Sequence, residues 1–447
     1  MSVEALLRSR FGWFRLGDAA TAADREQILE YATPKLGVGG QSQPGGVDKR
    51  MYHPAFCYLG VGLTFFITYL VFSRTQLDSN VYFYLPIALL ISFYTFVSVL
   101  TDRQVYLNRN SLHAVEKAVP KYLFWGVVLF LAHRFYSVHP FYLQATPNTR
   151  TLLRHFIYAY IACGFPYFFL EEKFRACTDN FLADPYLRFA AILKSVWNLD
   201  FSRLKRRVFN KRNRRTVLSW AIRMHYMPIM IEQVHDRLNS LDWENLFYSH
   251  SLPYVTFLVA TFAWMIDSNN ASIGYFWQST FTKSRFRDVD PHPSHWIIVL
   301  ACYYPFIDFV GYRFVPFPDI DFNSTRYFAS LTVNNVIDIA VLVALVGYML
   351  SGTSLAFSYS NLCYKKIQTR GAYGIVRHPC TTCKMIFFTL SFYRFADAHT
   401  GRWFVCYLFW MSIYIGRALV EERFLKRFGE YREYMKKTRY RFFPRIA

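Results

Sequence analysis

Long apolar runs, separated by shorter polar segments, recur along this chain from residue 54 onward. Many of them approach the roughly 20 residues that an α-helix needs to cross the hydrocarbon core of a bilayer. Because that core offers no water to backbone N–H and C=O groups, such runs predict transmembrane helices. The good candidates are residues 54–72, 81–100, 122–138, 152–170, 247–266, 294–311, 334–351 and 403–420.

Two further segments are ambiguous. Residues 216–233 include Arg223, His225 and Pro228, and residues 385–395 are short for a membrane span. Composition supports the membrane interpretation, because 53% hydrophobic residues, with 45 Phe and 33 Tyr among 447, exceed what an ordinary soluble enzyme contains. The sequence therefore predicts an all-α, multi-pass integral membrane bundle with about 8 to 10 transmembrane helices.

Basic residues gather on one predicted side of the membrane. If both ambiguous segments cross, the two termini lie on the same side, and that side carries 39 of the 51 Lys and Arg residues. Such an excess is typical of cytoplasmic segments, so both termini are predicted to be cytoplasmic. An alternative for residues 216–233 is an amphipathic helix that lies in the membrane interface. The segments on the side of the termini are 1–53, 101–121, 171–215, 267–293, 352–381 and 421–447.

Residues 1–50 are predicted to form a cytoplasmic segment and linker. They lack the apolar core and cleavage site of a secretory signal. Residues 1–17 are amphipathic and contain three Arg residues, and residues 37–46 are rich in Gly. This start suits an interfacial helix or, alternatively, a mitochondrial presequence. We therefore expect the endoplasmic reticulum or a bacterial inner membrane, with a mitochondrial membrane as the alternative.

The net charge of +21 would suit a nucleic-acid-binding protein, but the basic residues form short blocks between apolar runs. This pattern favours anionic membrane lipids as partners, and no nucleic acid. The clearest block lies within residues 171–215. There, residues 186–209 place apolar side chains near helical spacing and end in a cationic stretch, which predicts a helix lying on anionic lipid. The surrounding membrane region, 51–333, resembles no known family.

Residues 334–447 are predicted to form a membrane domain with a cytoplasmic tail, and they hold the candidate chemistry. Arg377, His378 and Pro379 lie where a polar loop becomes an apolar helix. Proline suits the first helical turn, and the free N–H groups and positive dipole end there favour a carboxylate or phosphate. The simpler alternative is an Arg–His pair that anchors the helix end in the interface.

Arg417 and Glu421 are four residues apart on a later apolar helix and share a face, with Glu422 beside them. Two carboxylates suit a cationic ligand such as an amino-acid ammonium, and an Arg at this depth is costly unless it is paired or lines a cavity. The alternative is an ion pair between Arg417 and Glu421 within the helix. An apolar hairpin separates these residues from Arg377, so the two polar segments are expected to meet at one membrane face.

Together, the two segments resemble the isoprenylcysteine carboxyl methyltransferase and phospholipid N-methyltransferase superfamily of membrane enzymes. The family pattern is roughly G-x-Y-x-x-x-R-H-P, an apolar hairpin, and then R-x-x-x-E-E-x-x-L-x-x-x-F-G-x-x-Y-x-x-Y with a final proline. The matching positions are Gly371, Tyr373, Arg377, His378 and Pro379 in the first half, and Arg417, Glu421, Glu422, Leu425, Phe428, Gly429, Tyr431, Tyr434 and Pro444 in the second.

The resemblance implies that S-adenosylmethionine binds between the two halves and gives its methyl group to a lipid or isoprenoid-linked acceptor. Such a transfer depends mainly on aligning nucleophile, methyl carbon and sulfur, so the lack of an obvious catalytic base is no objection. By carry-over, Arg417 takes the catalytic role of orienting the acceptor or the neighbouring carboxylates. The residues that would bind the cofactor are Tyr373, Arg377, His378, Glu421 and Glu422.

The chain departs from the family pattern after Pro379. Thr381 stands where the pattern has tyrosine, and Cys383 stands where it has glycine. A cysteine at this position is expected to narrow the cofactor pocket. Cys380 and Cys383 also form a C-x-x-C string, but no second pair lies nearby, so no metal site is predicted.

Two other functions stay open. A sterol-reductase-like enzyme would bind NADPH, and that family shares a closing Y-R-x-x-P string, here Tyr440, Arg441 and Pro444. A non-catalytic membrane subunit would keep the fold and dock protein partners, which the departures at Thr381 and Cys383 favour.

Overall fold

A computed structural model of the chain describes residues 53–75, 79–101, 111–173, 195–208, 211–277, 284, 286–307, 330–392 and 401–444. Within these ranges the protein is mostly helical, as predicted, and residues 1–50 lie outside them. The long helices are α3 (Pro54–Phe72), α4 (Ser79–Thr101), α5 (Ser111–Val138), α7 (Thr149–Lys173), α10 (Lys211–Asn239), α11 (Leu252–Phe276), α13 (Leu331–Thr353), α14 (Pro379–Phe392) and α15 (Gly401–Leu425). The short helices are α6 (Pro140–Ala145), α9 (Phe201–Val208), α12 (Pro293–Leu300) and α16 (Gly429–Lys437).

Three helices in the described part of the chain are long and apolar enough to cross a membrane. They are α3, α13 and residues Phe404–Leu425 of α15. The apolar stretch of α4, Phe83–Ser98, is shorter. A helical protein with membrane-spanning candidates is therefore supported, and the larger number of spans stays a prediction.

The predicted span 294–311 is wrong in length. Its helix, α12, ends at Leu300; turns and a bend occupy residues 301–305, Phe306 and Ile307 are helical again, and residues 308–311 are outside the described part. The apolar composition of the run did not reveal this break. The ambiguous segment 216–233, in contrast, lies within the 29-residue helix α10, which continues past Pro228.

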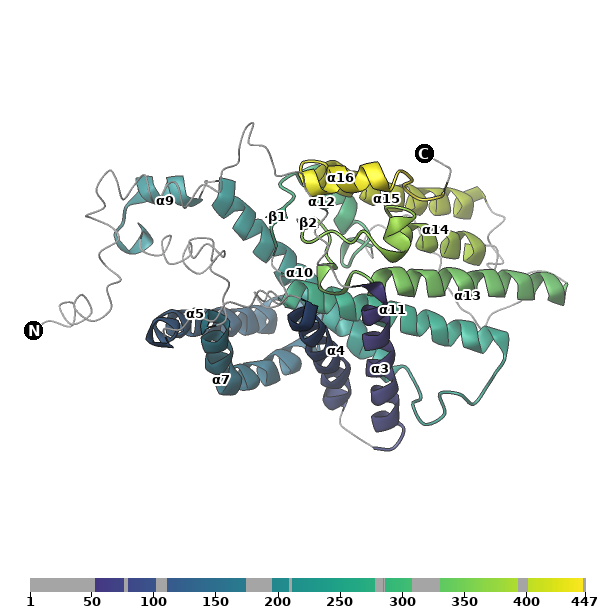
Figure 1. Cartoon of the computed structure of the whole chain (residues 1–447), viewed down its shortest axis with the longest axis horizontal. Coiled ribbons are helices and arrows are strands. Elements are labelled where there is room, and N and C mark those ends of the chain that lie inside the picture. Colours follow the sequence, from purple (N-terminus) through teal and green to yellow (C-terminus); the bar gives the residue numbers. More distant parts are fainter. Residues whose placement is uncertain are drawn as a thin grey trace, which may run out of the picture.

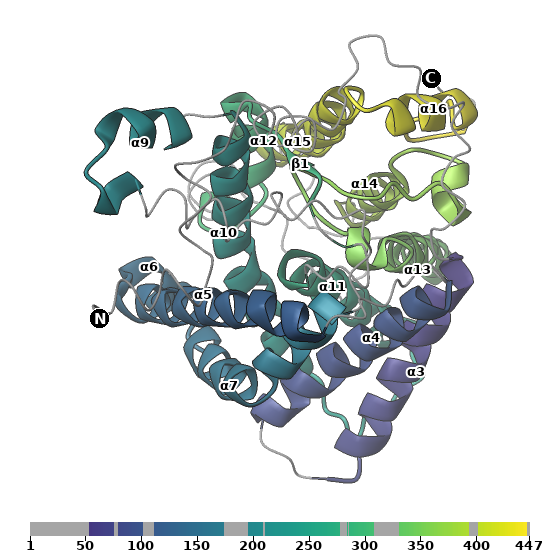
Figure 2. The ribbon, with the colours of Figure 1, turned by 60° about the vertical axis from the view of Figure 1, so that its left-hand side comes forward.

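Helices α11, α13, α14 and α15 carry the candidate site. α13 packs against both α11 and α14, and α14 packs against α15. Figure 1 shows the four helices running side by side, with α3 and α4 crossing below them. Figure 2 shows α5 and α7 as a separate pair, away from α14 and α15. The four helices share a core of apolar side chains that includes Ala263, Leu345, Phe387 and Trp410.

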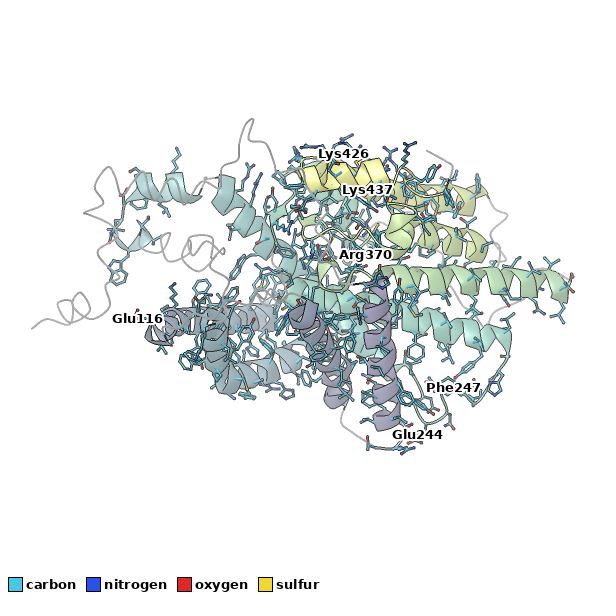
Figure 3. All side chains as sticks on the ribbon, viewed as in Figure 1. Glu116, Glu244, Phe247, Arg370, Lys426 and Lys437 are labelled. Carbon is cyan, nitrogen blue, oxygen red and sulfur yellow. The ribbon has the colours of Figure 1, made fainter. Side chains whose placement is uncertain are left out.

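Short elements close one end of the four helices, where α11, α13 and α15 end and α14 begins. Strands β1 (Asp288–Val289) and β2 (Cys363–Tyr364) pair antiparallel, and Val376 forms a parallel bridge with Tyr440 of the C-terminal tail. Helix α16 follows on this side, and Figure 3 shows its residue Lys437, with Lys426 just before it, at the opposite edge of the molecule from Glu244 and Phe247. The polar loops that contain these strands and the C-terminal tail therefore cover one end of the four apolar helices.

Candidate functional site

A cavity opens at this end of the four helices, with a volume of about 150 Å³. Its wall comes from the loop before α14, from α14 and α15, and from α16. Five of the six predicted site residues line it: Tyr373, Arg377, His378, Arg417 and Glu421.

The C-terminal tail holds Arg377 and His378 at the start of α14. The backbone N–H of Arg377 donates to the carbonyl of Tyr440 at 2.9 Å, and that of His378 donates to the carbonyl of Arg441 at 3.0 Å. The Arg377 Nη1 atom donates to the carbonyls of Thr438 and Arg439. Two segments that are far apart in sequence are therefore joined directly by hydrogen bonds.

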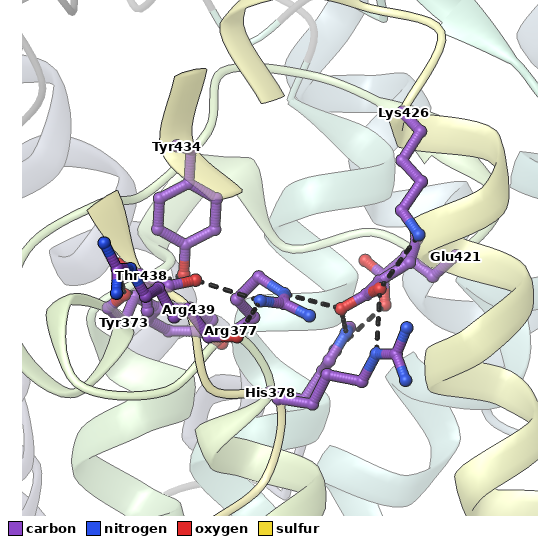
Figure 4. A network of polar contacts seen from close by, with 10 residues as sticks. Tyr373, Arg377, His378, Glu421, Lys426, Tyr434, Thr438 and Arg439 are labelled. Atoms are coloured by element: carbon purple, nitrogen blue, oxygen red, sulfur yellow. Dashed lines mark hydrogen bonds and ion pairs between the residues drawn. The ribbon is translucent and has the colours of Figure 1, made fainter. Parts of the chain in front are cut away.

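Glu422 is the centre of a buried ionic network. Figure 4 shows its partners Arg377, His378 and Lys426. Its side chain is 1% exposed, and Oε1 accepts from Arg377 Nε at 2.6 Å and lies 3.3 Å from His378 Nε2. Oε2 accepts from Arg441 Nε at 3.2 Å and lies 3.6 Å from Lys426 Nζ. Its two oxygens are thus occupied by protein cations, and Glu422 is the one predicted site residue that does not line the cavity.

Glu421 has the opposite environment. Neighbouring residues on a helix point about 100° apart, and the Glu421 side chain is 48% exposed and lines the cavity. Its Oε2 lies 3.9 Å from His378 Nδ1. The imidazole therefore lies within 4 Å of both acidic side chains, and Glu421 is the carboxylate that remains available to a ligand.

Arg417 does not form the ion pair with Glu421 that was the alternative to ligand binding: among the described residues, no contact of 4.0 Å or less joins their charged groups. Instead, its Nη2 donates to the Tyr303 hydroxyl at 3.1 Å and to the Asn361 side-chain oxygen at 2.9 Å. The guanidinium also lies over the Tyr303 and Tyr414 rings, at 5.2 and 5.9 Å from their centroids. Neutral partners thus hold a positive charge at the cavity wall.

Tyr373 follows Gly371, which has a φ of 63° that favours glycine. The Tyr373 hydroxyl lies 3.4 Å from Cys380 Sγ, and its carbonyl accepts from the Tyr434 hydroxyl at 2.7 Å. Burial raises the pKa of the Tyr373 hydroxyl well above its usual value, so this group is a neutral hydrogen-bonding partner. The contact with Tyr434 ties the loop to α16.

The expectation that Cys383 narrows the pocket is wrong. Cys383 is not among the residues that line the cavity, whereas Thr381 is. A Cβ atom added to Gly347 of α13 would come within 3.0 Å of Cys383 Sγ. The sulfur therefore occupies space that Gly347 leaves open between α13 and α14.

The structure adds two positions that the sequence did not single out as a site. Asp267 of α11 lies 3.7 Å from Lys384 Nζ of α14 and accepts a hydrogen bond from the Tyr359 hydroxyl. Lys384 and Tyr359 line the cavity. The charge of Lys384 within an apolar run was a visible signal, but Asp267 lies at the boundary of a predicted span, where a solvated carboxylate is common.

Lys365 is the second addition. It lines the cavity, is 4% exposed, and donates to the carbonyls of Gly274 and Phe357 at 2.5 and 2.8 Å. Burial lowers the pKa of Lys365 to about 7. In the sequence, Lys365 lies in a polar segment and therefore resembles an ordinary solvated lysine.

No metal site forms at the C-x-x-C string within the described part of the chain. Cys380 and Cys383 are free, and the one metal-like grouping found among the described residues is Glu232, His235 and Asp236 on α10. Asn148 Nδ2 already donates to Glu232 Oε1 at 2.6 Å and lies 3.2 Å from His235 Nδ1. Glu232 and His235 of this grouping therefore have a protein partner in Asn148.

Comparisons with models of protein families, with curated proteins and with solved structures find no match to this chain. The resemblance to the methyltransferase superfamily therefore rests on the two sequence motifs alone.

Proposed function

We propose that this protein is an integral-membrane methyltransferase that uses S-adenosylmethionine and acts on a lipid or isoprenoid-linked acceptor. The observation that carries the proposal is the convergence of Tyr373, His378, Arg417 and Glu421 on one cavity, from segments separated by an apolar hairpin. The motifs were matched from the sequence alone, so their meeting at one cavity is independent support.

The available groups suit the amino-acid part of the donor. Glu421, the exposed carboxylate, binds the methionine ammonium by a charge-assisted hydrogen bond. His378 and the N-terminal end of α14 bind the carboxylate or the adenosine. Arg377 and Glu422, which bind each other, hold these groups in place and form the rigid support of the site.

When bound, S-adenosylmethionine would supply a methyl group on a positively charged sulfur, and the acceptor would take up that methyl group. Arg417, one turn before Glu421 on α15, orients the acceptor and is held in place by Tyr303 and Asn361. Alignment of the three reacting atoms supplies most of the rate enhancement. The apolar core beneath the cavity keeps water away from the acceptor.

The membrane setting belongs to the same proposal. The acceptor enters from the bilayer between helices of a bundle with about 8 to 10 spans. Both termini lie in the cytoplasm, with the endoplasmic reticulum or a bacterial inner membrane as the location. The three apolar helices long enough to cross a membrane support this setting.

Ligand titration tests the proposal. S-adenosylmethionine is expected to raise the unfolding temperature of the purified protein, whereas NADPH is not. Glu421→Gln removes a charge-assisted hydrogen bond worth about 1.5–3 kcal/mol, so the donor should bind about 10- to 100-fold more weakly. Glu433→Gln is the matched control, because Glu433 is exposed on α16 and pairs with Lys436.

Any other outcome of the ligand titration favours one of the two alternative functions. Stabilisation by NADPH alone would support the sterol-reductase-like function. Absence of any response to either ligand would support the non-catalytic subunit.

A further inference from the structure

Residues 195–208, the anchor segment, present apolar side chains to the outside of the protein. Trp197 is 88% exposed, and Leu199 and Phe201 are each 72% exposed. The segment consists of a short helical turn followed by α9, which packs against α10. Figures 1 and 2 both show α9 at the edge of the molecule, away from α14 and α15. Exposed aromatic and aliphatic residues in such a cluster indicate an interaction surface.

Hydrogen bonds hold this apolar turn in a fixed shape. The backbone N–H groups of Leu199 and Asp200 donate to the carbonyls of Val196 and Ser195, each at 3.0 Å. Asp200 directly precedes α9, and its carbonyl accepts from Leu204 N at 2.8 Å. Leu199 has a φ of 53°, a left-handed conformation that is strained for leucine. Strained backbone with an exposed apolar side chain is typical of a functional surface.

The same segment is strongly basic. Asp200 is the only acidic residue between positions 195 and 215 in the sequence, whereas α9 alone contains Arg203, Lys205, Arg206 and Arg207. Lys205 is exposed. Apolar residues beside such a cationic stretch match the interface of an anionic bilayer, where acyl chains and phosphate groups lie a few ångströms apart.

We propose that the anchor segment binds the surface of an anionic membrane, with Trp197, Leu199 and Phe201 inserted at the headgroup level. Lys205 contacts lipid phosphates, and the indole of Trp197 occupies the interfacial zone that tryptophan favours. Nucleic acid is the other anionic partner to consider. It would be contacted by the basic residues, but it gives no reason for an exposed leucine held in a strained turn. This inference does not depend on methyltransferase activity.

Tryptophan quenching tests the insertion. The full-length protein is placed in phosphatidylcholine nanodiscs whose acyl chains carry bromine, with and without phosphatidylserine. The chain has 10 Trp residues, so the emission of Trp197 is taken as the difference between the wild type and Trp197→Phe. With phosphatidylserine present, most of this emission should be lost. The matched control is Trp243→Phe, because Trp243 is 7% exposed and buried in a core cluster.

A second variant tests how much the positive charge of α9 contributes to membrane binding. In it, the four basic residues of α9 are replaced by Gln. Quenching of Trp197 should then fall to the level seen without phosphatidylserine, and added salt should have the same effect on the wild type because it screens exposed charges. Trp197 emission that brominated lipid leaves unchanged would overturn the proposal. Quenching that is equal with and without phosphatidylserine would overturn its anionic part. A change in Trp197 emission with a single-stranded oligonucleotide, and none with lipid, would assign the surface to nucleic acid instead.

Discussion

At the scale of single residues, the pair Glu421 and Glu422 shows what a motif can and cannot predict. The sequence predicted two carboxylates at the end of an apolar helix, and both were candidates for a ligand. Their division into one exposed and one buried group depends on the tail, because Arg441 closes over Glu422 from a segment 19 residues later. No local pattern contains that contact.

This division leads to a stability prediction. Glu422→Gln leaves Arg377, a buried cation, without its carboxylate partner, and such a loss typically costs about 3–5 kcal/mol of unfolding free energy. Glu421→Gln changes an exposed group and should alter the unfolding free energy by no more than about 0.5 kcal/mol. Chemical unfolding of both variants, followed by helical circular dichroism, measures the difference. Equal effects of the two substitutions would contradict the assigned environments.

Lys365 predicts a pH dependence of stability. Its pKa is lowered from 10.5 to about 7 in the folded protein, so between these values the unfolded state binds more protons than the folded state. Stability from this group therefore rises as pH increases through that window, by up to about 1.4 kcal/mol per pH unit, and is constant below it. Below pH 7 the folded protein is less stable because it buries the protonated ammonium group of Lys365.

Lys365→Met isolates this contribution, because other groups also titrate at alkaline pH. The unfolding free energy of the wild type minus that of the variant should increase from about pH 7 to about pH 10. A difference that stays flat or falls over this range would show that the Lys365 charge is not destabilising when buried.

At the scale of elements, the length of the apolar runs predicted most helices, because run length is a local property of the sequence. The predicted run 54–72 has the same ends as α3. The failure at 294–311 shows that a count of hydrophobicity alone does not reveal a break within an apolar run. The fit between α13 and α14 has no local cause. Gly347 and Cys383 lie in different helices, and their complementarity appears only when the helices pack.

That fit predicts a coupling between two substitutions. Gly347→Ala places a methyl group 3.0 Å from Cys383 Sγ, and overpacking of this kind costs about 1–3 kcal/mol. The same substitution should cost at least about 1 kcal/mol less in a Cys383→Gly background, where the sulfur is gone. A double-mutant cycle of unfolding free energies measures the coupling. Additive effects would mean that the helices do not approach each other at this point.

At the scale of the whole molecule, the sequence predicted that the two motifs would meet but not what surrounds them. Asp267 comes from α11, outside the family-like segment, and reaches Lys384 across the helix packing. Gly274 of the same helix accepts from Lys365. The cavity therefore depends on α11 residues that reach it only through tertiary contacts. A search for motifs within the family-like segment cannot find such residues.

The largest structural prediction concerns α10. If this helix crosses the membrane, residues 240–251 lie on the side opposite both termini, and the basic residues 203–215 lie on the same side as the basic C-terminal tail, as the excess of Lys and Arg requires. Figure 3 shows Glu244 and Phe247 at the opposite edge of the molecule from Lys426 and Lys437. If α10 instead lies in the interface, the loop stays on the side where α10 begins.

A protease-sensitive tag distinguishes the two arrangements. In one variant the tag is inserted between Tyr248 and Ser249, where Tyr248 is 71% exposed. In two other variants it is placed at the N-terminus or at the C-terminus. In sealed vesicles with the cytoplasmic face outward, protease should cut both terminal tags and leave the loop tag intact, because α10 carries the loop across the bilayer. Cleavage of all three tags would place α10 in the interface. The positive-inside argument would then require a different set of crossing helices, since the loop and the termini would share one side.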